Sequence, residues 1–233
     1  MRLSILLLTC LLALGGCATR QPPVPGLHDA PASAGDEQLG WRRILIQQRW
    51  DPQTTPDWNL EPLLAAELLG PSIDRHRPGL RYWRFHRRAA NDSAGHQFSL
   101  LLYTDGNTAR QLYQELLDHP WTAELLATDI QRIRHRGINQ NSEPAVEDRS
   151  DPSWSPEMQR AWPAYITGVS ELWLGLIREY RSQAPAPQSL AEARPRYARI
   201  NRQLTELWQA EGQHALLHHL NALFGYQPLL IRY

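Results

Sequence analysis

Two runs of alternating residues, joined by a turn-rich segment, constrain the fold of this chain more than any other feature. The runs are residues 80–88 (LRYWRFHRR) and 96–104 (HQFSLLLYT), and the segment between them contains Asn, Asp, Ser and Gly, which favour turns. Alternate side chains of a strand point to opposite faces. Trp83 and Phe85 therefore share one face, with Arg84 and His86 on the other. The pattern predicts an antiparallel hairpin with a dry and a wet face.

Much of the remaining chain has helical periodicity. A helix is expected over residues 60–69, capped by Asn59 and stopped by Gly70-Pro71. Helical spacing resumes after Asp105 and continues to Ile133, with Pro120 dividing it into two pieces. Residues 43–50 fit either a strand or a helical turn, and residues 227–233 fit a final strand.

Two long helical stretches complete the pattern. Ser155-Pro156-Glu157 is a typical helix start, and the stretch that follows it reaches about Arg181. Its predicted core stripe consists of Met158, Trp162, Ile166, Val169, Trp173, Leu176 and Tyr180. Residues 190–224 carry two apolar stripes at different angles, so we expect two helices and a break near Gly212. The fold class predicted is α+β, a small antiparallel sheet packed against several helices.

The composition excludes several functions. The 24 basic residues are all Arg and are balanced by 24 acidic residues. Zero net charge argues against a nucleic-acid binder, and a chain without Lys cannot form a Schiff base through a lysine. The two Cys residues are too few for a disulfide-built scaffold.

The N-terminus has the features of a secretion signal. A short positive start precedes an apolar run, Leu3 to Leu14, that is too short to span a membrane. The residues Leu14-Gly15-Gly16-Cys17 then resemble the lipobox of bacterial lipoproteins. The alternative is a plain signal peptide with a chance cysteine. The resemblance implies cleavage before Cys17, diacylglycerol on its thiol and an acyl chain such as palmitate on its amine.

The same resemblance implies a location and a domain organisation. No Asp follows Cys17, and in enterobacterial lipoproteins such an Asp marks retention in the inner membrane, so we expect the outer membrane, facing the periplasm. Residues 1–16 form the lipoprotein signal peptide. Residues 17–38 form the lipidated Cys and a Pro-rich tether, and residues 39–233 form a single globular domain.

Two groups of side chains are candidate sites. Arg84, His86 and Arg88 on the wet face of the hairpin, with His96 near the turn, could bind a carboxylate or phosphate. The alternative is a charged surface that discourages edge pairing. Glu211, His214 and His218 share a helix face at spacings of three and four, which suits zinc or iron. Here the alternative is a solvated helix face.

Two further candidates are weaker. Glu147, Asp148 and Asp151 lie in a long polar loop and could bind Ca²⁺, act in acid–base chemistry, or pair with the arginine-rich strand. Ser93 precedes a Gly and a His at short range but lacks the G-x-S-x-G elbow. No Walker loop, dinucleotide glycine fingerprint or H-E-x-x-H motif occurs.

We therefore expect a lipid-anchored envelope protein with a binding, assembly or accessory role and without catalysis. Its expected partners are the membrane, through the lipid, and an envelope protein or anionic ligand. Nucleic acid is excluded as a partner, and no cofactor is expected. The alternative is an envelope metalloenzyme or hydrolase that uses Glu211, His214 and His218.

Overall fold

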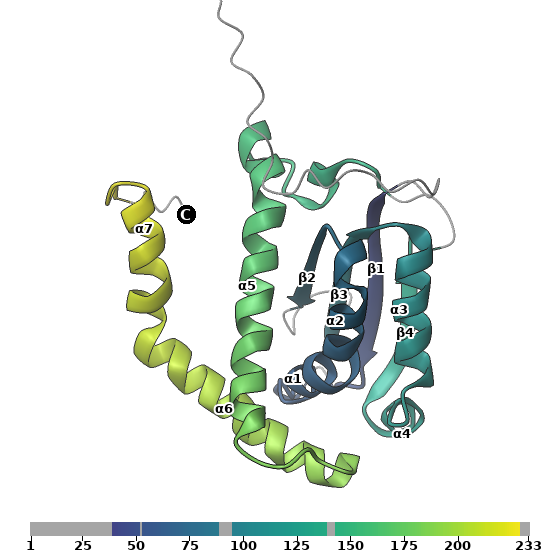
Figure 1. Cartoon of the computed structure of the whole chain (residues 1–233). Helices are drawn as coiled ribbons and strands as arrows, with labels where there is room; N and C mark the ends of the chain where they lie inside the picture. Colours follow the sequence, from purple (N-terminus) through teal and green to yellow (C-terminus); the bar gives the residue numbers. More distant parts are fainter. Residues whose placement is uncertain (1–38, 52, 89–94, 139–142, 229–233) are drawn as a thin grey trace, which may run out of the picture. The chain divides into compact units, whose positions relative to one another are not determined.

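The computed structural model describes residues 39–51, 53–88, 95–138 and 143–228. It confirms the α+β class (Figure 1). The predictions for the signal peptide, for Cys17 and for the tether concern residues outside this range, as does the prediction for Ser93.

The sheet has four strands, and each neighbouring pair is antiparallel. The strands are β1 (Gly40–Gln48), β2 (Tyr82–Arg87), β3 (Gln97–Thr104) and β4 (Ile130–Arg136), in the order β2-β3-β1-β4. The β2–β3 pair confirms the predicted hairpin. Residues 43–48 belong to a strand, so the alternative of a helical turn at this place is wrong.

The prediction of a helix reaching Ile133 is wrong, because Ile130 and Ile133 lie in β4. Helix α3 (Gly106–Asp118) and helix α4 (Thr122–Thr128) are separated around Pro120 as expected, but the chain then extends. Ile133 pairs with Ile46 of β1, and Ile130 is fully buried beside the same strand. Both isoleucines reach the core through this pairing, and their helix-like spacing comes from a bulge in the ladder.

Helices cover one face of the sheet. Figure 1 shows α1 (Leu60–Leu63), α2 (Gly70–His76) and α3 in front of the strands. A π-helical segment, η1 (Leu64–Leu69), joins α1 to α2, and a short 3-10 turn, η2 (Arg77–Gly79), follows. The core between these helices and the sheet contains Ile44, Ile46, Phe98, Leu100, Leu102, Leu63, Leu64, Leu69, Leu112 and Leu116.

Two details predicted for the first helix are wrong. Gly70-Pro71 does not end it, because Pro71 falls in the first turn of α2, where a backbone N–H has no helical partner to lose. Asn59 is not a side-chain cap; its Oδ1 instead accepts a hydrogen bond from Asn201 Nδ2 at 3.1 Å. The contact joins the start of α1 to the last long helix.

Helix α5 (Pro156–Ser182) lies along the outer edge of the sheet. Ser155 caps it by accepting a hydrogen bond from the Met158 N–H, and the helix continues through Pro163. The hydroxyls of Thr167 and Ser170 accept hydrogen bonds from two backbone N–H groups of β2, at 3.2 and 3.1 Å. These bonds satisfy donors that an edge strand would otherwise expose.

The predicted core stripe of α5 is partly wrong. Ser170, Leu174 and Ile177 are buried, whereas Met158 and Val169 are exposed. The side of the helix that carries Thr167 and Ser170 faces β2, so the side that carries Met158 and Val169 is left in solvent. The preceding loop contains one short 3-10 turn, η3 (Val146–Arg149).

The C-terminal helices differ in burial. Helix α6 (Leu190–Gly212) buries its predicted stripe at Leu190, Tyr197, Ile200 and Leu204. The helical path changes after Gly212 into the π-helical η4 (Gln213–His218) and then α7 (His219–Leu223), close to the expected break. The second stripe is exposed at Leu217, Leu220, Leu223 and Phe224, so only the first of the two stripes is buried.

Two remaining observations concern the C-terminal residues and the possibility of a membrane-spanning helix. Residues 227 and 228 are not in a strand, and the rest of the predicted final strand lies outside the described residues. No helix in the described part of the chain combines the length and the apolar character needed to cross a bilayer.

Candidate functional site

Three arginines lie in one row across the face of the sheet opposite α1–α3. Arg43 on β1 pairs with Leu101 of β3 on one side and with Arg136 of β4 on the other. Leu101 in turn pairs with Arg84 of β2. Residues paired across antiparallel strands point to the same face, so the three guanidinium groups project from a common surface. We call Arg43, Arg84, Arg136 and the adjacent Arg149 the arginine face.

An aromatic row and a loop border this face on one side. Trp41 Nε1 donates a hydrogen bond to the carbonyl of Val146 at 2.8 Å, and the Tyr103 hydroxyl donates one to the carbonyl of Pro144 at 2.7 Å. The Trp41 and Tyr103 rings meet edge to face, with centroids 5.3 Å apart. These bonds hold the loop over the end of the sheet and bring Arg149 to the row.

The prediction of a fully wet face is therefore corrected. Trp41, Leu101 and Tyr103 point to this face and are buried, because β3 is a central strand and the loop covers their row. Arg43 and Arg84 are therefore half-buried beside apolar side chains, where Coulomb interactions are screened less than in open water, whereas Arg136 is exposed.

Arg84 is held by an aromatic ring rather than by a carboxylate. Its guanidinium carbon lies 4.5 Å from the ring centroid of Trp162, a cation–π distance. Its Nη2 donates a weak hydrogen bond of 3.4 Å to the carbonyl of Arg149. The Nε atoms of Arg84 and Arg43 are buried and make no hydrogen bond in the described part of the chain. Buried donors of this kind usually have an acceptor.

The arginines repel each other. Burial, together with the charges of Arg149, Arg136 and Arg88, lowers the pKa of Arg43 to about 10, while Glu143 acts in the opposite direction. Burial together with Arg43 and Arg149 likewise lowers the pKa of Arg84 to about 10. Within the described residues, Glu143 is the one carboxylate among the groups that shift these two values, and it also contacts Arg149. The cluster has an excess of positive charge.

The structure brings together some of the predicted residues. Arg84 and His86 lie on this face. Arg88 follows β2, and its charge lowers the pKa of Arg43. His96 lies apart from them, because it faces the helices. Sequence reasoning missed Arg43, Arg136 and Arg149. The alternation of Arg132, Arg134 and Arg136 is typical of a strand with arginines on one face. The interpretation of the segment up to Ile133 as a helix hid this pattern.

Of the roles considered for the acidic loop, pairing with the arginine-rich strand is not seen for Asp148 or Asp151 among the described residues. Asp148 accepts a hydrogen bond from the Ala145 N–H, and Asp151 accepts one from the Ser153 N–H, both at 2.8 Å. These carboxylates order turns within the loop. The loop reaches β2 instead through the backbone carbonyl of Arg149.

Of the predicted metal ligands, Glu211 lies at the end of α6, and His214 and His218 lie in η4; all three are exposed. The rings of His214 and His218 are stacked with centroids 5.2 Å apart, and His219 is close to both. Among the residues that the structure describes, no three His, Cys, Asp or Glu side chains are placed to hold a metal ion. Metal binding by Glu211, His214 and His218 stays a prediction.

A second polar cluster lies under the helices. Glu61 on α1 is 0% exposed, and its carboxylate accepts hydrogen bonds of 2.9 Å from Gln48 and from Arg87. His96 Nε2 is 3.2 Å from the same carboxylate, and the Trp58 ring packs edge-on against His96. The cluster joins α1 to β1, to β2 and to the residue before β3, which indicates a structural role. The sequence concealed it, because Glu61 lies within an apolar helical segment.

Comparison of the chain with protein-family models, with curated proteins and with solved structures gives no match. The function is therefore inferred from the residues of the chain and their arrangement.

Proposed function

We propose that this chain is an outer-membrane lipoprotein, anchored through Cys17 and facing the periplasm, whose folded domain binds an anionic ligand on the arginine face. Its role is binding or assembly rather than catalysis. The observation that supports the site is the row formed by Arg84, Arg43 and Arg136 across the sheet.

The chemistry of the row suits carboxylate or phosphate. A guanidinium group has several N–H donors in a planar fork and binds such anions in a bidentate manner. An anion placed between Arg43 and Arg84 would offset their mutual repulsion. The buried Nε donors of both residues would also gain an acceptor. The relief of charge repulsion is available to an anion and not to a neutral ligand.

The spacing of the row favours an extended ligand. Neighbouring strands lie about 4.8 Å apart, so the backbones at Arg84 and Arg43, two strands apart, are separated by about 10 Å. Arg136 extends the row by one further strand. A segment of an envelope protein with several acidic side chains, or a small molecule with more than one anionic group, matches this length.

Titration of the purified protein tests the site. The probes are inorganic phosphate and a short polyglutamate peptide, and tryptophan fluorescence reports binding because Trp162 contacts Arg84. Hydrogen bonds to charged groups contribute about 1.5–3 kcal/mol. Arg84→Gln should therefore weaken binding at least about 10-fold, and added salt should weaken it as well.

The matched control is Arg202→Gln, which alters an exposed arginine on α6 outside the arginine face. It should leave the affinity unchanged. Equal affinity of the Arg84→Gln variant and the unsubstituted protein for both probes would remove the proposed site.

The anchor is tested separately. Cys17→Ser should block acylation, so that the protein is released from the membrane or its precursor stays uncut. Recovery of a processed, unacylated variant in the outer-membrane fraction would contradict the proposed anchor.

A further inference from the structure

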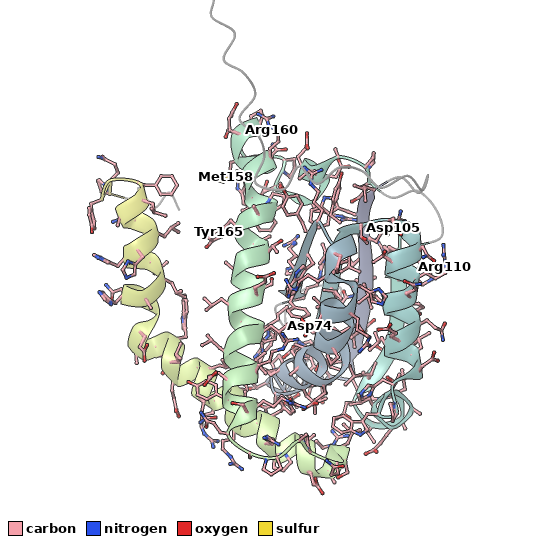
Figure 2. All side chains as sticks on the ribbon, viewed as in Figure 1. Asp74, Asp105, Arg110, Met158, Arg160 and Tyr165 are labelled. Carbon is pink, nitrogen blue, oxygen red and sulfur yellow. The ribbon has the colours of Figure 1, made fainter. Side chains whose placement is uncertain are left out.

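The outward side of α5 is unusually apolar for a solvent-exposed helix. Between Ala161 and Gly175, the one exposed charged residue is Glu171. A surface helix normally has charged and polar residues on its solvent side. Figure 2 shows Met158 and Tyr165 on the side of α5 that is turned away from the sheet. This side is unpartnered in the described chain.

Large and small residues alternate along this side with heptad spacing. The large residues, 41–51% exposed, recur every seven positions: Met158, Tyr165 and Leu172. A small residue follows each of them three positions later: Ala161, Gly168 and Gly175. This 3–4 spacing is that of the positions through which helices pair in coiled coils. The pattern therefore suits packing against another helix.

The arrangement is complementary to itself when two copies of α5 run in opposite directions. Tyr165 of one copy then faces Gly168 of the second copy, and Leu172 faces Ala161 of the second copy. Met158 in the same way faces Gly175. All pairs are symmetric about the peptide bond between Ile166 and Thr167. A parallel pair would instead place Tyr165 against Tyr165 and glycine against glycine.

We propose that this chain forms a two-fold symmetric dimer through antiparallel packing of α5. A two-fold interface uses the same surface of both copies, so it requires a self-complementary surface of this kind. Each large side chain of one helix enters the space beside a small residue of the other. That space exists, because a Cβ added to Gly168 or Gly175 would meet no atom within 4 Å.

Exposed apolar side chains extend from α5 to the C-terminal arm. The C-terminal arm, η4 and α7, exposes further large side chains, including Leu223 at 85% and Phe224 at 67%. Figure 1 shows this arm on the side of α5 away from the sheet. Together with Met158, Tyr165, Val169 and Leu172 of α5, these side chains present several hundred Å² of apolar surface per chain. The largest apolar patch of a typical monomer is about 300–600 Å², and a standard interface buries about 800 Å² per partner.

The oligomeric state of the full-length protein in mild detergent tests the proposal. Sedimentation equilibrium at micromolar concentration should show a dimer. Gly168→Leu should weaken dimerisation at least about 10-fold, because the new side chain occupies the space needed by Tyr165 of the second copy. Its fold should persist, since the position is open and leucine favours a helix over glycine. Far-UV circular dichroism checks this. Ala123→Leu, at an exposed position of α4, is the control and should stay dimeric.

A second variant tests the direction of packing. Combining Tyr165→Ala with Gly168→Leu exchanges the large and small positions at the centre of the interface. In an antiparallel pair the leucine of each copy again faces a small residue, so dimerisation should recover relative to Gly168→Leu alone. In a parallel pair the two leucines would still collide.

Three outcomes would overturn the proposal. The first is that the unsubstituted protein is a monomer, whether or not it binds phospholipid vesicles through α5. The second is a dimer that Gly168→Leu leaves intact. The third is that the double variant dimerises no better than Gly168→Leu alone. None of these measurements depends on the anion site, so they separate the dimer from the proposed function.

Discussion

Replacing Arg43 with methionine should make the protein more stable and less able to bind anions. Burial and neighbouring arginines lower the pKa of Arg43 to about 10, so the charged form is less favourable in the folded chain than in the unfolded chain. Because the folded-state pKa is the lower one, this penalty is fully present at pH 7. It fades as the pH rises through 10 toward the higher pKa of the unfolded chain.

The size of the effect follows from the same pKa. The lowering of the Arg43 pKa to about 10 corresponds to at most about 3.4 kcal/mol at 1.36 kcal/mol per pH unit. Arg43 is only partly buried, so solvent screening reduces this to about 1–1.5 kcal/mol. For a domain of this size, 1 kcal/mol corresponds to about 2–4 °C. Arg43→Met should therefore raise Tm by about 3 °C at pH 7.

Thermal unfolding followed by tryptophan fluorescence measures both parts of the prediction. Without ligand, the Arg43→Met variant should melt above the unsubstituted protein. Added phosphate should raise the Tm of the unsubstituted protein more than that of the variant, because a ligand that binds more tightly stabilises the folded state more. The advantage of the variant should also shrink above pH 10.

The control is Arg202→Met, which removes an exposed arginine from α6 and should leave Tm unchanged. A fall in Tm on replacing Arg43 would refute the reasoning, because it would show that Arg43 makes a net stabilising contact in the unliganded fold.

Three further predictions concern the rest of the chain. Glu61→Ala leaves Arg87 and His96 without their buried carboxylate, so it should cost about 3–5 kcal/mol in urea unfolding; a cost below about 1 kcal/mol would contradict the structural role of the cluster. Burial opposes the ionisation of Glu115, but hydrogen bonds from Arg75, Ser72 and His76 outweigh it and lower its pKa to about 2. The stability it contributes is present above pH 4.5 and lost as the pH falls toward 2, so Glu115→Gln should lose less stability over that interval; an equal loss would count against the network. Elemental analysis should find no stoichiometric metal, and His214→Ala with His218→Ala should leave folding unchanged; zinc or iron that this double variant loses would favour the metalloenzyme alternative.

Local patterns predicted much of the fold. Alternation identified the β2–β3 hairpin, and Ser155-Pro156 identified the start of α5. These features depend on residues close in the chain, because turns, caps and strand faces are set by neighbouring side chains. The change of helical path after Gly212 was also predictable, since two apolar stripes at different angles cannot be buried by one straight helix.

Patterns that depend on a distant partner were misread. Ile130 and Ile133 have helical spacing but lie in a strand, because β4 pairs with β1, which is far away in sequence. Met158 and Val169 fit a core stripe but are exposed, because α5 presents Thr167 and Ser170 to the edge of β2. In both cases, packing overrode the local preference.

The sequence by itself determined the α+β class, the central hairpin with Arg84 on its outer side, and the alternating large and small residues of α5. The tertiary structure alone decided that Arg43 and Arg136 join Arg84 in one row, since strand order and register set which residues become neighbours. It also decided which side of α5 faces solvent. The physical reason is that charge repulsion and burial depend on distances in space, and residues from separate strands acquire those distances only when the sheet assembles.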